Sequence, residues 1–231
     1  MRVDRRAMTK EEVRRRIVEV GMIPVIRAAS AKEASFAVEA VAAGGIPVAE
    51  LTMTVPGAID LIADLARTMG TDVLIGAGTV LDAETARRCI DAGAEFIVSP
   101  GFDSETVELA RERGKLVMAG ALTPTEVITA WKAGCDFVKI FPCGNVGGPK
   151  YIRALKGPLP QVPMIPTGGV NLETAAEFIR AGADALGVGG ELVSPVALKS
   201  RDTVEISRMA GRFVALIAEE RSNRTTLAVM R

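Results

Sequence analysis

The chain has 231 residues, of which 48% are hydrophobic, and this suits a globular protein with a substantial apolar core. Its 28 basic residues equal its 28 acidic ones, so the formal net charge of zero argues against nucleic acid or an anionic membrane as the main partner. The chain has no histidine, which excludes Ser-His-Asp and Cys-His nucleophile systems and most catalytic zinc sites.

Short apolar strands alternate with Ala-rich helical segments along almost the whole sequence. Before the first strand, Thr9-Lys10-Glu11-Glu12 has the capping-box pattern, which predicts an extra N-terminal helix. The predicted strands cover residues 22–26, 46–51, 72–75, 95–98, 115–118, 136–141, 162–166 and 183–188. The predicted helices cover residues 31–43, 57–69, 83–92, 104–113, 124–133, 149–155 and 172–181, and a last helix runs from about 204 to 220.

Eight strand–helix units in this order predict a single (β/α)8 TIM barrel, an α/β fold, with an extra N-terminal helix. The strands are continuous apolar runs, as expected of parallel strands that are covered on both faces. A doubly wound open sheet is the alternative, but no Gly-rich dinucleotide fingerprint follows the first strand. The sequence therefore predicts one domain over residues 1–220 and a polar tail over 221–231, with a composition compatible with disorder.

The three cysteines, Cys89, Cys135 and Cys143, are few, odd in number and scattered, which is typical of reduced thiols in a cytoplasmic protein. Cys143 has no histidine to activate it and is interpreted as an inert thiol. No apolar run reaches the length of a membrane span, so no membrane partner is expected.

Lys139 lies inside an apolar strand, in the run Phe137-Val138-Lys139-Ile140-Phe141-Pro142. Burying a charged ammonium among such residues is costly unless the amine is neutral or in use. A neutral buried amine can form Schiff bases with carbonyl substrates. The alternative is a lysine on an exposed strand face, or one that reaches out of the core to water.

The carboxyl ends of barrel strands carry the working residues of this architecture. Arg27 ends the first strand, Glu50 lies on the second, and strand periodicity gives Glu50 and Lys139 the same inward direction. A simple buried ion pair is a poor explanation, because desolvating both charges costs about as much as their attraction returns. A lysine nucleophile with a carboxylate that shuttles protons is the better interpretation.

Two Gly-Gly pairs follow the seventh and eighth predicted strands, Gly168-Gly169 and Gly189-Gly190. Asn171 is the expected N-cap of the helix after the first pair. Backbone N–H groups at these places form the usual phosphate site of a (β/α)8 barrel, although one Gly-Gly alone usually marks only a turn. The implied substrate is a small phosphorylated carbonyl compound.

Several motifs together resemble the class I 2-keto-3-deoxy-6-phosphogluconate (KDPG) aldolases, over roughly residues 23–193. They are Val-Ala-Glu-Leu-Thr at 48–52, Gly-Ala-Gly-Thr-Val at 76–80, Val-Ser-Pro-Gly at 98–101, Val-Lys-Ile-Phe-Pro at 138–142, the Gly-Pro-Lys-Tyr run at 148–158 and Pro-Thr-Gly-Gly-Val at 166–170. The resemblance implies a Schiff-base aldolase that needs no metal or cofactor, is usually a homotrimer, and often also acts on 4-hydroxy-2-oxoglutarate.

By position in these motifs, Lys139 looks like the Schiff-base lysine and Glu50 like the general acid/base. Thr79 and Thr167 look like donors of hydrogen bonds to the substrate, and Pro100 and Phe141 are expected to contact it. By the same resemblance, the backbone amides that bind the phosphate are those of Gly168, Gly169, Gly189 and Gly190.

Two positions depart from the family pattern. Some members have an arginine shortly after the catalytic glutamate, where this chain has Met53-Thr54-Val55-Pro56. Our hypothesis is that Arg27 supplies that charge to the substrate carboxylate, and a surface arginine is the alternative. Glu191 stands where many members have a phosphate-binding serine, so it turns away, pairs with a cation, or faces a substrate without a phosphate there.

Two other functions compete with the aldolase. One is a sugar-phosphate epimerase or decarboxylase on the same kind of barrel, and the other is a barrel that binds phosphorylated ligands without catalysis. The Glu50–Lys139 pair speaks against both, since ligand binding alone requires no buried amine. The sequence does not separate gluconate-derived from galactonate-derived substrates, which differ at one stereocentre.

Overall fold

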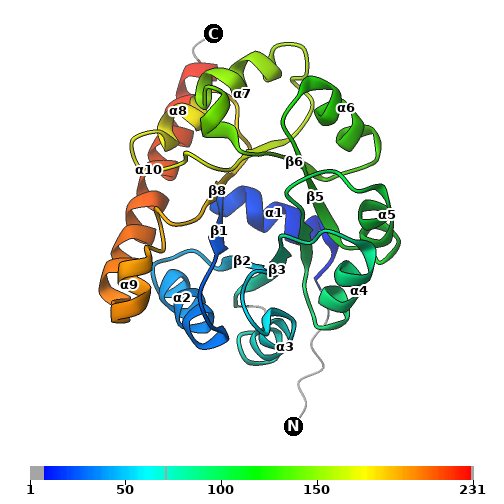
Figure 1. Cartoon of the computed structure of the whole chain (residues 1–231). Coiled ribbons are helices and arrows are strands. Elements are labelled where there is room, and N and C mark those ends of the chain that lie inside the picture. The colour runs from blue at the N-terminus through cyan, green and yellow to red at the C-terminus, as the bar shows by residue number, and fades with distance from the viewer. Residues whose placement is uncertain (1–7, 71, 230–231) are drawn as a thin grey trace.

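Eight parallel strands surround the centre of the molecule in a computed structural model that describes residues 8–70 and 72–229 (Figure 1). The strands are β1 (Met22–Ile26), β2 (Val48–Thr52), β3 (Leu74–Gly78), β4 (Phe96–Val98), β5 (Leu116–Ala121), β6 (Phe137–Ile140), β7 (Met164–Pro166) and β8 (Leu186–Val188). They pair in the order β7-β6-β5-β4-β3-β2-β1-β8, and a parallel bridge between Thr167 and Gly187 joins the two ends. The predicted (β/α)8 barrel is therefore confirmed, and the doubly wound alternative is wrong.

Helices form a ring around the strands, as Figure 1 shows. The ring consists of α2 (Ala31–Ala43), α3 (Ala58–Thr68), α4 (Ala83–Asp91), α5 (Ser104–Glu112), α6 (Pro124–Lys132), α7 (Pro149–Lys156), α8 (Ala175–Arg180) and α10 (Thr203–Val229). Two short helices, η1 (Cys143–Val146) and α9 (Pro195–Ser200), were not expected from the sequence. None of the helices within the described ranges is long and apolar enough to cross a membrane.

The predicted N-terminal helix, α1 (Lys10–Val20), lies across the amino end of the barrel. Its capping box is present: the Glu12 amide donates to the Thr9 hydroxyl, and the Thr9 amide donates to the Glu12 carboxylate. Val13 and Ile17 point inward and pack with the apolar side chains of the barrel interior. This helix closes the amino end of the barrel with an apolar layer.

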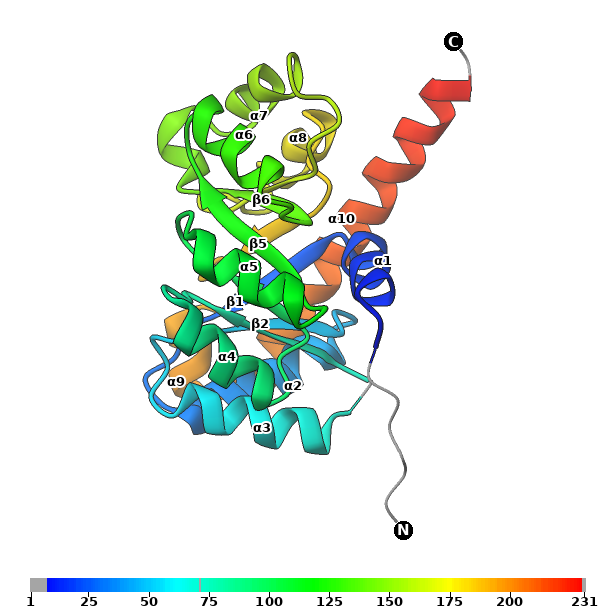
Figure 2. The ribbon, with the colours of Figure 1, turned by 90° about the vertical axis from the view of Figure 1, so that its right-hand side faces the viewer.

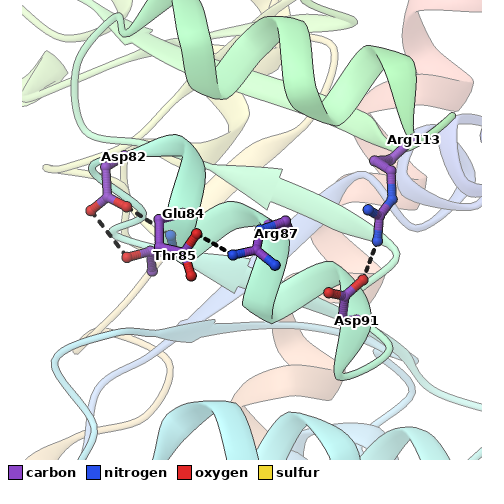
Figure 3. A network of polar contacts seen from close by, with 6 residues as sticks. All are labelled: Asp82, Glu84, Thr85, Arg87, Asp91 and Arg113. Atoms are coloured by element: carbon purple, nitrogen blue, oxygen red, sulfur yellow. Dashed lines mark hydrogen bonds and ion pairs between the residues drawn. The ribbon is translucent and has the colours of Figure 1, made fainter.

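The outer surface of α4 shows how polar side chains fix a helix of the ring (Figure 3). Asp82 is its N-cap and accepts hydrogen bonds from the amide of Thr85 at 2.7 Å and from the Thr85 hydroxyl at 3.0 Å. Further along, Arg87 pairs with Glu84 within the helix. Asp91 at the end of α4 pairs with Arg113, the C-cap of α5, and so links two neighbouring helices.

Asn171 caps the turn that leads into α8. Its side-chain oxygen accepts from the amides of Glu173 and Thr174, and its carbonyl accepts from the amide of Ala175 at 2.9 Å, although the helix itself begins at Ala175 rather than at 172. One prediction about a helix end is wrong. The last helix does not end near residue 220 but continues to Val229, so the polar tail predicted from residue 221 is helical that far. Figure 2 shows α10 extending past the barrel beside α1. Residues 1–7 of the predicted domain and 230–231 of the predicted tail lie outside the described residues.

Candidate active site

Lys139 and Glu50 face each other inside the barrel. Lys139 pairs with Gly120 of β5 in register and Glu50 with Gly76 of β3, so both side chains project from the inner wall. Their side chains are only 6% and 4% exposed, and the Lys139 Nζ lies 3.6 Å from the Glu50 Oε1. The inward direction predicted for both residues is confirmed, and the exposed alternative for Lys139 is wrong.

The surroundings of the pair are apolar toward the amino end of the barrel. Below the pair lie Val48 and Phe137, each two residues earlier on the same strand, together with Leu74 and Phe96. At the other end, the Nζ of Lys139 lies 5.5 Å from the centroid of the Phe141 ring. The pair therefore stands on an apolar floor, with the carboxyl-end loops above it.

The contact between the two charges is loose. At 3.6 Å it is an ion pair beyond ordinary hydrogen-bond distance, and the Oε1 of Glu50 is buried without a hydrogen-bond partner among the described residues. A buried pair with an unsatisfied oxygen contributes little net stability, since desolvation offsets the attraction. The arrangement therefore fits a reactive pair better than a structural ion pair.

Thr79 has an unusual backbone conformation directly after β3. Its φ of +57° lies in the left-handed region, which a β-branched residue rarely adopts. Such a conformation costs about 1–3 kcal/mol and is found mainly at functional sites. The amide of the next residue, Val80, donates to the carbonyl of Val98 at 3.1 Å and anchors the turn. Because Thr79 directly follows β3, it lies at the carboxyl end of the barrel strands.

Thr167 is buried where β7 and β8 meet. Its amide donates to the carbonyl of Ile140, and its own carbonyl accepts from the amide of Cys143, both at 2.9 Å. A Cβ placed on Gly187 would lie 2.2 Å from the Thr167 hydroxyl oxygen, so this glycine leaves the space that the hydroxyl occupies. The threonine is thereby fixed one strand away from Lys139.

The two predicted glycine pairs have different backbone geometries. Gly168 and Gly169 both have positive φ, +88° and +74°, so glycine is required there for the backbone turn itself. Gly189 and Gly190 have no positive φ, and the space where a side chain of Gly190 would lie is open. Both pairs follow neighbouring strands, as the phosphate-cradle prediction requires.

Arg27 is exposed at the end of β1, beside the second glycine pair. Its guanidinium nitrogen Nη1 lies 3.8 Å from the position that a Cβ of Gly189 would occupy. No hydrogen bond or ion pair engages Arg27 within the part of the chain that the structure describes. Glu191, two residues after Gly189, is exposed and has no ion pair among the described residues. Pairing with a cation therefore does not account for a glutamate at this position.

Pro100 and Phe141 are half-buried at the carboxyl ends of β4 and β6. The carbonyl of Pro100 lies 2.1 Å from where a Cβ of Gly120 would be, so the loop after β4 reaches over β5. Cys143 is fully buried, and burial raises the pKa of its thiol to about 12, which agrees with an inert thiol. No cluster of three or more Cys, Asp or Glu side chains suited to a metal forms among the described residues.

The sequence places Gly78, Gly120 and Gly187 at the carboxyl ends of their strands, but reasoning from it assigned them no role in the site. The spaces they leave are filled by Glu50, the Pro100 loop and Thr167 respectively. A signal was present for the first, since Gly76 and Gly78 alternate within an apolar strand and hence share one face.

The comparisons with known proteins agree with this geometry. A family model described as KDPG and KHG aldolase matches residues 13–209. The 2-dehydro-3-deoxy-phosphogluconate aldolase of Pseudomonas aeruginosa is 31% identical over 88% of this chain and 92% of its own length. The 2-dehydro-3-deoxy-6-phosphogalactonate aldolase of Escherichia coli K12 is 36% identical over 74% of this chain and 83% of its own length.

Among solved structures, the KDPG aldolase of Legionella pneumophila was captured with pyruvate as a covalent carbinolamine intermediate. It is 30% identical, and the superposition covers 86% of this chain and 96% of that one with a TM-score of 0.80. These matches extend over nearly the whole barrel, including every strand that carries a candidate site residue. The chain belongs to the KDPG and KHG aldolase family, whose members are class I, pyruvate-dependent lyases.

Proposed function

We propose that this protein cleaves 2-keto-3-deoxy-6-phosphogluconate to pyruvate and glyceraldehyde 3-phosphate through a Schiff base on Lys139. The observation that carries the proposal is the buried Lys139–Glu50 pair at the carboxyl end of the barrel. A barrel that only binds a phosphorylated ligand has no need of an amine in this place, and an epimerase has no need of a nucleophile.

The first half of the reaction makes the imine. The neutral amine of Lys139 attacks the C2 carbonyl carbon, and the carbonyl oxygen takes up a proton to give a carbinolamine. Loss of that hydroxyl as water gives the protonated imine. Glu50, whose Oε1 lies 3.6 Å from the Lys139 Nζ, supplies and removes the protons.

The second half breaks the carbon chain. The C4 hydroxyl gives up its proton to Glu50, the C3–C4 bond breaks, and its electron pair moves through C2 onto the imine nitrogen. The phosphorylated aldehyde leaves, and an enamine of pyruvate remains on Lys139. Protonation of the enamine at C3 and hydrolysis of the imine then release pyruvate and restore the amine.

The remaining candidate residues bind the substrate in this proposal. Thr79 and Thr167 donate hydrogen bonds from their hydroxyls, while Phe141 and Pro100 line the carbon chain. The amides of Gly168, Gly169, Gly189 and Gly190 bind the phosphate. Arg27 lies beside Gly189, which favours contact with the phosphate over contact with the carboxylate expected from the sequence.

The names of two relatives suggest two further substrates to test on this protein. The Escherichia coli K12 relative with 36% identity is named for the galactonate-derived substrate, and another relative from that strain is named KHG/KDPG aldolase. We therefore propose that 2-keto-3-deoxy-6-phosphogalactonate and 4-hydroxy-2-oxoglutarate be assayed beside the gluconate compound. Cleavage of 4-hydroxy-2-oxoglutarate would give pyruvate and glyoxylate.

The decisive experiment traps the imine. The protein is incubated with pyruvate, reduced with borohydride and digested, and the adduct is located by tandem mass spectrometry. We expect the adduct on Lys139 and none in the Lys139→Arg variant. An unmodified Lys139 in the folded protein would refute the Schiff-base mechanism, whereas an adduct without cleavage of the three substrates would refute only the substrate assignment.

We also propose the homotrimer that the resemblance implies. Size-exclusion chromatography with light scattering should then give a mass three times the 24.3 kDa of the chain. A monomeric mass at micromolar concentration would contradict this proposal without affecting the chemistry at Lys139.

A further inference from the structure

Gly78 ends β3 and lies against the side chain of Glu50. A Cβ built on Gly78 would lie 2.0 Å from the Glu50 Oε1 and 2.5 Å from both its Cδ and its Cγ. These three nearest atoms all belong to Glu50. The carboxylate therefore occupies the space that any other residue at position 78 would fill with its own side chain.

The backbone of Gly78 does not itself require glycine. Its φ lies outside the left-handed region, in contrast to Gly168 and Gly169, so a residue with a side chain could adopt the same conformation. Glycine in an interior strand position weakens a strand and usually marks the close approach of another group. Here the approaching group is a carboxylate, 3.6 Å from the amine of Lys139.

The position of Glu50 is set by shape rather than by hydrogen bonds. Its Oε1 is buried and accepts no hydrogen bond from the described residues. Gly76 lies two residues before Gly78 on β3, toward the amino end of the barrel. The space beside it is already filled by the Phe96 ring, which would lie 2.2 Å from a Cβ on Gly76. Since Oε1 accepts no hydrogen bond, the attraction of Lys139 and the hollow at Gly78 are what keep the carboxylate in this position.

We propose that Gly78 is a positioning residue: its missing side chain forms the hollow that holds the Glu50 carboxylate beside Lys139. The inference rests on the proposed role of Glu50 in proton transfer. Gly78 acts through Glu50 alone and touches no reacting atom. Its replacement by alanine displaces the carboxylate and slows the proton transfers, while pyruvate binding is largely kept.

The test is a double-mutant cycle with Gly78→Ala, Glu50→Ala and the double variant. Pyruvate is the probe, because enamine formation exchanges its methyl hydrogens with deuterated water, a rate that NMR follows without any aldehyde. We expect Glu50→Ala to lower the exchange kcat by about 10²–10⁴-fold. Gly78→Ala should lower it about 100-fold with little change in KM, as expected of an ångström-scale misplacement.

The cycle separates positioning from general damage. Glu50→Ala removes the three atoms nearest to the new Cβ, so Gly78→Ala should cause no further loss of kcat in that background. A matched control is Gly76→Ala, on the same strand and face, which meets Phe96 instead. It should lower the melting temperature and leave kcat close to that of the wild type.

Three results would overturn the proposal: an unchanged kcat in Gly78→Ala, an equal loss in the Glu50→Ala background, or an equal loss in Gly76→Ala. If Gly78→Ala alone does not fold, a folded double variant shows that Glu50 is the group it meets, and an unfolded double variant refutes that. Full exchange in Glu50→Ala would instead refute the proposed role of Glu50, and the positioning with it.

Discussion

Arg180 at the end of α8 forms a bidentate ion pair with Glu220 of α10. Its Nε donates to the Glu220 Oε2 at 2.7 Å, and a second guanidinium nitrogen donates to the other oxygen. Glu220 is only 8% exposed, although it lies in a polar stretch near the end of the chain. A two-point pair with a largely buried carboxylate fixes α10 against the barrel more firmly than a surface ion pair does.

Arg180→Ala should therefore lower the free energy of unfolding by more than the loss of an exposed ion pair does, because the Glu220 carboxylate stays largely buried without its partner. The arginine itself is half-exposed, which keeps the loss below that of a fully buried pair. Urea unfolding followed by circular dichroism measures the change.

Arg208→Ala provides the matched control, since Arg208 pairs with Glu205 three residues away on the exposed surface of the same helix. Arg208→Ala should lower the free energy of unfolding by less than about 0.5 kcal/mol. Equal losses in the two variants would show that the Arg180–Glu220 pair contributes nothing beyond an ordinary surface contact.

Arg27→Ala tests which end of the substrate this exposed cation holds. A lost charge-assisted hydrogen bond of about 1.5–3 kcal/mol corresponds to a rise of about 10–100-fold in KM for the phosphorylated substrate. Because Arg27 lies beside Gly189, the KM of pyruvate in the exchange assay should stay unchanged. A parallel rise in both KM values would assign Arg27 to the carboxylate, and no rise in either would leave it a surface arginine.

Asp82 should make part of the stability depend on pH. The hydrogen bonds that its carboxylate accepts from Thr85, above all from the backbone amide, lower its pKa from the usual 3.8. The stabilisation is then fully present above pH 3.8 and is lost as the pH falls through the lowered pKa of the folded state.

Asp82→Asn keeps a side-chain acceptor at the N-cap but removes the titration, so stability should fall less steeply between about pH 4 and pH 2. Glu108→Gln removes a charge from an exposed position of α5 that accepts no hydrogen bond among the described residues, and it serves as the control. Indistinguishable acid unfolding curves for Asp82→Asn and wild type would contradict the prediction.

Strand periodicity was sufficient to predict that Glu50 and Lys139 both point into the barrel. Alternation along two apolar strands gave Glu50 and Lys139 the same inward direction, and the barrel topology brought them together. The side-chain direction follows from the local strand pattern, and the approach of the two strands follows from the regular topology of the (β/α)8 barrel. The capping box at Thr9 was predictable for the same reason, because its contacts span only three residues.

Features that depend on contacts between distant segments could not be predicted. The extension of α10 to Val229 is accompanied by contacts of Glu220 with α8 and of Arg221 with the carbonyl of Glu19, 202 residues away. The role of Gly78 emerges only once the side chain of Glu50 is placed across the strands. A polar sequence alone gives no sign of such docking, so the sequence predicts only a polar tail over residues 221–231.

Cys143 provides the last prediction, because it follows the strand of Lys139 and could be mistaken for the nucleophile. Its sulfur is fully buried, and desolvation raises the pKa of the thiol from 9.0 to about 12, so almost no thiolate forms at pH 8. The folded protein should therefore resist iodoacetamide at pH 8 and react only after unfolding. Cys143→Ala should keep its turnover and lose about 1 kcal/mol of stability from the small cavity. Loss of turnover in a folded Cys143→Ala variant would place the thiol in the chemistry and contradict a mechanism carried by Lys139 and Glu50.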